Sequence, residues 1–112
     1  MISRHWKGIA KRDLADRYVG HLEGDTFPKL ASLTGFVRAT ILRREVDAGT
    51  EFQVVTLWES PASIAAFAGA DLEAAVVPAN VQAMMVDYDR RAVHYDVVAS
   101  FDSGHTAGPD VR

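Results

Sequence analysis

Two neighbouring strand-like segments near the middle of the sequence constrain the fold most. Residues 51–59, Glu-Phe-Gln-Val-Val-Thr-Leu-Trp-Glu, are rich in β-branched and aromatic side chains and predict a strand. Residues 36–46 predict the preceding strand, and residues 47–50, Asp-Ala-Gly-Thr, predict a four-residue hairpin loop. In both strands apolar side chains fall on the two faces: Phe52, Val54 and Trp58 against Val55 and Leu57, and Phe36 and Leu42 against Val37, Ala39 and Ile41. We therefore expect both faces of this sheet to be covered.

Helix and strand patterns flank this hairpin. Residues 2–9 predict a first strand, and Asp13 is the predicted cap of a helix whose apolar residues recur at four-residue spacing towards Gly24. A short helical piece with Pro28 in its first turn follows. Ser60-Pro61 predicts the start of a second helix that stops at Gly69. Residues 79–89 are compatible with helix or loop, and residues 92–98 predict a last strand. This order predicts an α+β fold, a ferredoxin-like βαββαβ sheet with both helices on one face.

Composition narrows the functional classes. The 112 residues suit one domain, which we place at residues 1–98, with a mobile tail at 99–112 that is rich in glycine and proline breakers. The net charge is -3 and basic residues cluster only in pairs, so we expect no nucleic-acid partner. The absence of cysteine excludes disulfides and thiolate chemistry. No apolar run approaches the roughly 20 residues of a membrane span, and the first residues lack the apolar stretch of a leader. We expect a cytoplasmic protein without a membrane partner.

The number of predicted helices bears on assembly. Two helices can cover one face of the sheet, and no predicted element remains for the other face. An uncovered apolar sheet would form a large exposed patch. A second copy of the same sheet would cover it through a two-fold interface, so we expect a homodimer. The alternative is a monomer whose long loops fold over the sheet.

Four segments resemble one known family. They are Arg4-His-Trp-Lys-Gly8, Thr34-Gly-Phe36, Thr56-Leu-Trp-Glu-Ser-Pro-Ala-Ser-Ile-Ala-Ala-Phe67 and Val93-His-Tyr-Asp-Val97. Together they resemble the antibiotic biosynthesis monooxygenase-like proteins over residues 1–98. The resemblance implies a dimeric α+β barrel, in which two sheets pack across a two-fold axis and a cleft lies between sheet and helices. It implies less about chemistry, because this superfamily includes cofactor-independent oxygenases, haem-degrading enzymes and proteins without a known reaction.

The haem-degrading branch of that family fits the sequence poorly. Its members carry an asparagine in the first strand, a tryptophan on the second helix and a histidine as iron ligand. The corresponding positions here hold His5 or Trp6, then Phe67, and Val77 near the ligand position. No two of the four histidines are spaced to hold a metal on one helix, and neither a dinucleotide nor a P-loop fingerprint is present. We expect no cofactor and no metal.

The predicted chemistry lies on the first and last strands. His94 is a titratable ring in an otherwise apolar strand and is the candidate proton acceptor; the alternative is a histidine hydrogen-bonded in the core or at a dimer seam. Arg4 is the candidate that stabilises a phenolate or enolate, and Trp6 would stack on the substrate, if their shared strand face is the cleft face. If it is the dimer face, both are interface residues. The further candidates for the substrate-binding wall are Phe67, Tyr95 and Trp58. His21 is expected on a solvent-facing helix surface.

Two functions follow from these patterns. The first is a cofactor-independent monooxygenase acting on a small planar aromatic substrate such as a quinol or an anthrone. The second is a non-catalytic homodimer that binds a small hydrophobic ligand or has a structural role. An enzyme should have a closed cleft with a polar group aimed into it, whereas a structural dimer should fill that space with side chains.

Overall fold

One antiparallel sheet organises the molecule in this computed structural model, which describes residues 1–103. Its strands are β1 (Ile2–Ala10), β2 (Phe36–Val46), β3 (Gly49–Trp58), β4 (Met85–Tyr88) and β5 (Val93–Asp96). The strand order is β2-β3-β1-β4, and β5 pairs with the first residues of β1, beyond the part that β4 reaches. The predicted last strand, residues 92–98, is β5, whereas β4 was not predicted and lies within residues 79–89, which were expected to be helix or loop.

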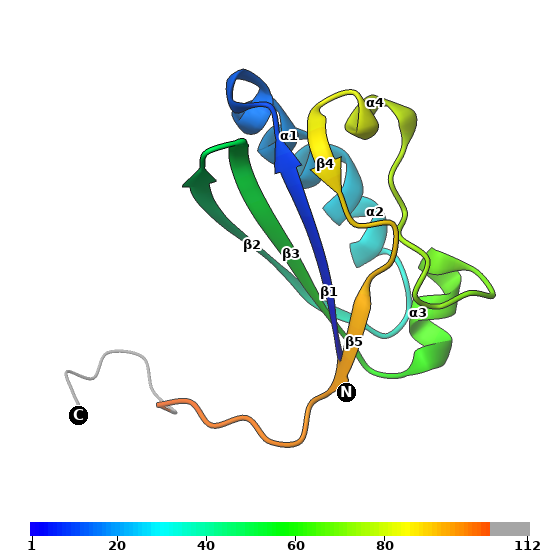
Figure 1. Ribbon diagram of the computed structural model, residues 1–112. Coiled ribbons are helices and arrows are strands. Elements are labelled where there is room, and N and C mark those ends of the chain that lie inside the picture. Colours follow the sequence, from blue (N-terminus) through cyan, green and yellow to red (C-terminus); the bar gives the residue numbers. More distant parts are fainter. Residues whose placement is uncertain (104–112) are drawn as a thin grey trace.

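The helices lie on one face of this sheet (Figure 1). A continuous helical segment comprises a 3₁₀ turn η1 (Arg12–Leu14), α1 (Ala15–His21), a π turn η2 (Leu22–Thr26) and α2 (Phe27–Ala31). The second helix, α3 (Pro61–Ala68), begins after Ser60, whose hydroxyl accepts the backbone N–H of Ser63, and ends at Gly69 as predicted. A short α4 (Ala79–Gln82) precedes β4. The predicted ferredoxin-like α+β class is confirmed.

The β2–β3 hairpin differs from the prediction in two places. Val46 pairs with Gly49, so the loop has two residues, Asp47 and Ala48, where four were expected. A bulge lies at Val37, because Phe36 pairs with Trp58 while Arg38 already pairs with Leu57. A bulged residue shifts the alternation by one position. Phe36 therefore packs on Trp58 on the helix-covered face, whereas simple alternation had placed it with Leu42 on the opposite one.

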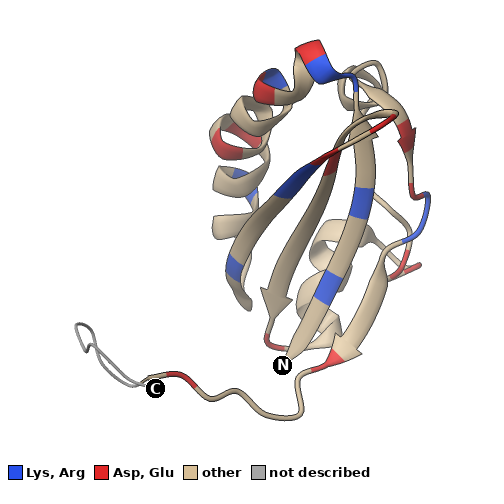
Figure 2. Ribbon diagram, turned by 60° about the vertical axis from the view of Figure 1, so that its left-hand side comes forward, with Lys and Arg blue, Asp and Glu red and all other residues tan. Residues whose placement is uncertain are grey.

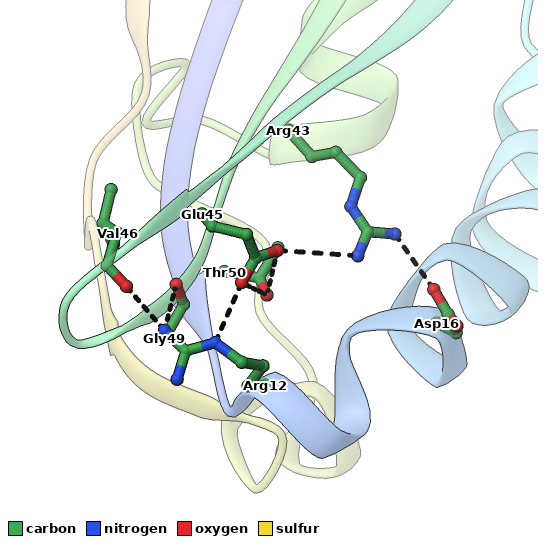
Figure 3. Close-up of polar contacts among 7 residues, drawn as sticks. All are labelled: Arg12, Asp16, Arg43, Glu45, Val46, Gly49 and Thr50. Atoms are coloured by element: carbon green, nitrogen blue, oxygen red, sulfur yellow. Dashed lines mark hydrogen bonds and ion pairs between the residues drawn. The ribbon is translucent and has the colours of Figure 1, made fainter.

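The start of the helical segment is tied to that hairpin. Asp13 does not cap it, since it lies inside the 3₁₀ turn and the capping position is Lys11. Instead Arg12 donates from Nε to Glu45 Oε1 at 2.9 Å and from Nη2 to the Val46 carbonyl at 2.6 Å (Figure 3). In the same close-up Asp16 of α1 pairs with Arg43 of β2 at 3.0 Å. These contacts fix the helical segment over the sheet, although each exposed ion pair adds little stability by itself.

The core divides into two clusters between the helices and the sheet. The first cluster joins the α1 end of the helical segment to α4 and the middle of the sheet: Ala10, Ala15, Tyr18, Leu22, Phe52, Val81, Met84 and Met85. The second joins α2 to α3 around Trp58, with Leu30 and Ile64. Met84 and Met85 are core residues and do not line the pocket. The space where the two clusters meet is not filled.

The other face of the sheet carries no helix in the described part of the chain (Figure 1). The register aligns two rows across it, Thr40–Val55–His5–Val93 and Arg38–Leu57–Ser3–Tyr95. This face is mixed, and not uniformly apolar as the sequence pattern suggested. Charged residues are scattered over helices, strands and loops without a continuous basic stripe (Figure 2).

The chain leaves the sheet after β5. The Val97 N–H still donates to the Met1 carbonyl at 2.9 Å, while residues 98–103 form no helix or strand and are exposed. The remainder of the predicted mobile tail, residues 104–112 with His105, lies outside the described residues. No helix between residues 1 and 103 is long and apolar enough to cross a membrane.

Candidate functional site

A pocket lies between the sheet and the helical segment, where the two core clusters meet. Its wall combines side chains of β1, β3, the helical segment, α3 and the stretch before α4: Arg4, Trp6, Tyr18, His21, Leu22, Thr26, Phe27, Leu30, Val54, Thr56, Phe67, Val76, Val77, Pro78 and Val81. The inner space measures about 70 Å³, and with the solvent at its mouth the empty space is about 580 Å³. The site is therefore a small pocket that opens to solvent.

Arg4 supplies the positive charge of the wall. It is only 4% exposed although it carries a guanidinium, and the ring of Phe67 lies 5.6 Å from its Cζ. Its Nη1 donates to the carbonyl of Leu72 and its Nη2 to the carbonyl of Ala74, the latter at 2.7 Å. These bonds tie the stretch after α3 to β1. The face shared by Arg4 and Trp6 is therefore the cleft face, one of the two alternatives left open by the sequence.

The charge of Arg4 has no direct counterion. Within residues 1–103 no carboxylate oxygen lies within ion-pair distance of its guanidinium. Burial lowers the pKa of Arg4, and the more distant charge of Glu73 opposes this effect. Of the five guanidinium N–H groups, three donate to the partners found in this part of the chain, leaving the Nε–H and one Nη2–H available. A buried cation of this kind is a site for an anionic group.

His94 holds Arg4 instead of facing the pocket. It pairs with Arg4 across β1 and β5, and its Nε2 accepts the third guanidinium hydrogen bond at 2.8 Å. The accepting nitrogen must be unprotonated. Burial, and secondly the charge of Arg4, lower the pKa of His94, which favours this neutral form. His94 is not part of the pocket wall, so its lone pair serves Arg4 and is not directed at a ligand.

The aromatic side of the wall is formed by Trp6 and Tyr18. The Trp6 indole N–H donates to the Asp89 carbonyl at 2.8 Å, and its ring centroid lies 6.3 Å from that of Tyr18. Burial raises the pKa of the Tyr18 hydroxyl far above its usual range, so this group remains neutral. Trp6 thus lines the pocket, and its contact with a planar ligand stays a prediction.

Of the other predicted wall residues, only Phe67 lines the pocket. Trp58 is completely buried behind it, stacked on Phe67 with centroids 6.0 Å apart. Its indole N–H donates to Thr56 Oγ1 at 2.8 Å, which fixes the ring in the core. Tyr95 lies on the uncovered face of the sheet and is 58% exposed, because its partner in the register is Ser3 and not Arg4. The structure therefore does not place Trp58 or Tyr95 in the pocket wall.

His21 is the site residue that the sequence pattern missed. It was expected to face solvent, but its side chain is only 12% exposed and lines the pocket. Its Nε2 is buried without a hydrogen-bond partner among residues 1–103, and the nearest carboxylate oxygen, Asp25 Oδ2, is 3.9 Å away. Leaving a buried polar atom unpaired costs about 1–3 kcal/mol, which makes such an atom a candidate ligand contact.

The π turn explains why this wall was hard to predict. At about 100° per residue, Phe27 would point about 140° away from Leu22 in a regular α-helix. A π turn absorbs one extra residue, which brings the two side chains to within about 40° of each other. Both line the pocket. The turn ends two residues before Pro28. Pro28 has no N–H to donate to the preceding turn and its ring crowds a carbonyl of that turn, so Pro28 is the local sequence signal for the π turn.

No group of three or more potential metal ligands occurs within the described part of the chain. The polar groups of the wall are one guanidinium, one imidazole and the hydroxyls of Tyr18, Thr26 and Thr56 in a mostly apolar surface. A mostly apolar wall with a few polar groups is typical of a small-molecule site.

Comparisons with known proteins agree with the fold. No protein-family model and no curated protein matches the chain. Among solved structures, the chain is similar to a Putative Antibiotic Biosynthesis Monooxygenase from Bacillus cereus, with a TM-score of 0.66 and 17% identity over 94% of this chain and 98% of that one. It is also similar to a mutant of MhuD with two manganese protoporphyrin IX molecules bound per active site, with a TM-score of 0.54 and 19% identity over 92% and 100% of the two chains. At these sequence identities the likeness shows the fold alone.

Proposed function

We propose that the protein is a cofactor-independent monooxygenase of small aromatic compounds that carry an acidic hydroxyl group, with the pocket at Arg4 as its active site. The observation that carries this proposal is the buried guanidinium, which has two available N–H groups and no carboxylate beside it. An ionised phenol or quinol provides the missing negative charge. The structure of the Bacillus cereus protein supports the reaction class through the shared fold.

The chain would promote the reaction by binding and by electrostatics. Loss of the hydroxyl proton leaves an electron-rich anion, which Arg4 stabilises in a site of low dielectric constant. Trp6 and Phe67 flank the ring plane and orient it. The anion passes an electron to dioxygen. For a naphthohydroquinone, one oxygen atom of dioxygen then forms a new C–O bond. The other oxygen atom leaves as water with the two hydrogens that the substrate loses overall. The product is a hydroxynaphthoquinone.

The test is oxygenation of naphthohydroquinone with isotopically labelled dioxygen. The wild-type protein should form hydroxynaphthoquinone with one labelled oxygen, without releasing hydrogen peroxide. Arg4→Met should lower the rate by about 10²–10³-fold, the usual cost of one oxyanion-stabilising donor. Arg17→Met is the matched control, because Arg17 is exposed on α1 and lies outside the pocket. Wild-type turnover at the buffer rate would refute the proposal, as would equal rates for Arg4→Met and the control.

The second candidate is a non-catalytic protein that binds a small hydrophobic ligand in the same pocket. The apolar character of most of the wall favours it. Saturable binding of naphthohydroquinone that hydroxynaphthoquinone displaces, without formation of any product, would identify this function.

A bound porphyrin is not part of the proposal. The positions that the haem-degrading pattern would use hold Phe67 and Val77, whose side chains line the pocket and cannot ligate iron. His21 is the one imidazole in this wall, and no acidic or sulfur ligand accompanies it.

We also propose that two copies associate through the uncovered face of the sheet. Val55 and Leu57 are half-buried there on β3, and Val93 and Tyr95 are exposed on β5, on the other side of His5 and Ser3 of β1. Burying these apolar residues against a second copy satisfies a two-fold interface, and Thr40 and Arg38 at the β2 end of the two rows would remain at the rim.

Light scattering at micromolar concentration tests the dimer. The wild-type protein should have twice the mass of one chain. Leu57→Asp should give a folded protein of one-chain mass, because it places a charge in the interface. Ala66→Asp is the matched control, since Ala66 is exposed on α3 and outside both sites. A wild-type protein of one-chain mass would contradict this proposal.

A further inference from the structure

We infer that His21 is the proton acceptor of the pocket, and that the ligand hydroxyl donates to its Nε2. This inference rests on the proposed function and deepens it. Three observations carry it: His21 lines the pocket that Arg4 also lines, its Nε2 is buried, and that nitrogen has no hydrogen-bond partner among residues 1–103. His94, the other histidine on the helix-covered face of the sheet, is excluded from this role because its Nε2 already accepts from Arg4.

The two groups have complementary tasks. The O–H bond of the ligand breaks, its proton passes to Nε2 of His21, and the electron pair stays on the oxygen. The resulting phenolate is then stabilised by the free Nε–H and Nη2–H of Arg4. The imidazolium that forms is stabilised by Asp25, whose Oδ2 lies 3.9 Å from Nε2. Asp25 also pairs with Lys29 at 3.1 Å.

The helical segment positions this acceptor. His21 is the last residue of α1, and the π turn begins at the next residue. Widened turns of this kind occur frequently at functional sites. Because the turn carries Leu22 and Thr26 into the same wall, the acceptor sits beside the apolar surface on which the ligand ring rests.

A pair of probes separates proton acceptance from simple pocket shape. para-Nitrophenol donates a hydrogen bond and absorbs visible light when ionised, whereas para-nitroanisole has the same ring without the O–H group. At neutral pH the wild-type protein should bind para-nitrophenol mainly as phenolate. His21→Gln should shift the bound probe towards the neutral phenol and weaken its affinity about tenfold, the cost of one hydrogen bond to a charged group. The affinity for para-nitroanisole should be unchanged. Arg17→Gln is the matched control on the same helix.

A second measurement uses the wild-type protein alone, so it does not depend on the stability of a variant. In nitrogen-labelled protein, saturation with para-nitrophenol should protonate Nε2 of His21, while the imidazole signals of His94 stay those of the neutral ring. Unchanged His21 signals, or equal loss of affinity for both probes in His21→Gln, would overturn the inference. These readouts do not require turnover. A protein that shows them but does not oxidise naphthohydroquinone would refute the proposed oxygenation while leaving the role of His21 intact.

Discussion

Replacement of Gly8 by alanine should deform the pocket from the sheet side. The indole of Trp6 lies over Gly8, and a Cβ at this position would be 2.5 Å from Trp6 Cη2 and 3.2 Å from Met85 Sδ. Carbon atoms in contact are normally about 3.5–4.0 Å apart, so the indole must move by about 1 Å. The movement is directed away from the sheet, into the pocket, and it strains the hydrogen bond from Trp6 to the Asp89 carbonyl.

The expected cost follows from these contacts. Overpacking costs about 1–3 kcal/mol, and alanine returns about 0.4–1 kcal/mol by restricting the unfolded chain. The net loss of about 1–2 kcal/mol should lower the melting temperature of a domain this size by about 5–10 °C. Circular dichroism measures the unfolding, and titration with para-nitroanisole should show weaker binding in a narrower pocket.

Gly20→Ala is the control for the same chemical change. Gly20 is exposed in α1 and a Cβ there meets no atom within 4 Å. Alanine should raise the free energy of unfolding by about 0.5–1 kcal/mol because it favours the helix. If Gly8→Ala also stabilises the protein and leaves the affinity for para-nitroanisole unchanged, the packing of Trp6 over Gly8 is not as described.

Three further outcomes are expected. Thr56→Val leaves the buried indole N–H of Trp58 without its acceptor and should cost about 1–3 kcal/mol in urea unfolding; an unchanged midpoint would mean that the N–H finds another partner. Ser60→Ala removes the cap of α3 and should cost about 1 kcal/mol by the same assay, with Ser60→Gly losing less. The pKa of His94 is lowered in the folded state, so the unfolded chain binds the proton first and wild-type stability should fall as the pH drops below 6.5. His94→Gln should flatten that part of the stability curve, and parallel curves would contradict the shift.

The elements with strong local signals were predictable from the sequence. Ser60-Pro61 and Gly69 bound α3 as expected, because capping, proline placement and a positive-φ stop act within a few residues. The alternation of β1 correctly placed Arg4 and Trp6 on one face. Which face of β1 points towards the helices could not be predicted, because the two faces of a strand are equivalent until helices cover one of them.

The errors arise where a regular period is interrupted. The bulge at Val37 moves Phe36 to the helix-covered face, and the π turn before Pro28 brings Phe27 into the pocket wall. The role of His94 depended on a different kind of information. Its polar character in an apolar strand was compatible with a proton acceptor or with a hydrogen-bonded histidine, and only the register of β5 against β1 shows that it bonds Arg4.

The central claim is that a small aromatic anion binds at Arg4, between the sheet and the helical segment. A crystal structure of the protein with hydroxynaphthoquinone, the expected product, tests it most directly. We predict the ring against Trp6 and Phe67, one ionised oxygen within hydrogen-bond distance of the Arg4 guanidinium, and a second polar contact at Nε2 of His21. Binding only on the uncovered face of the sheet, or in the pocket with no oxygen near Arg4, would contradict the account.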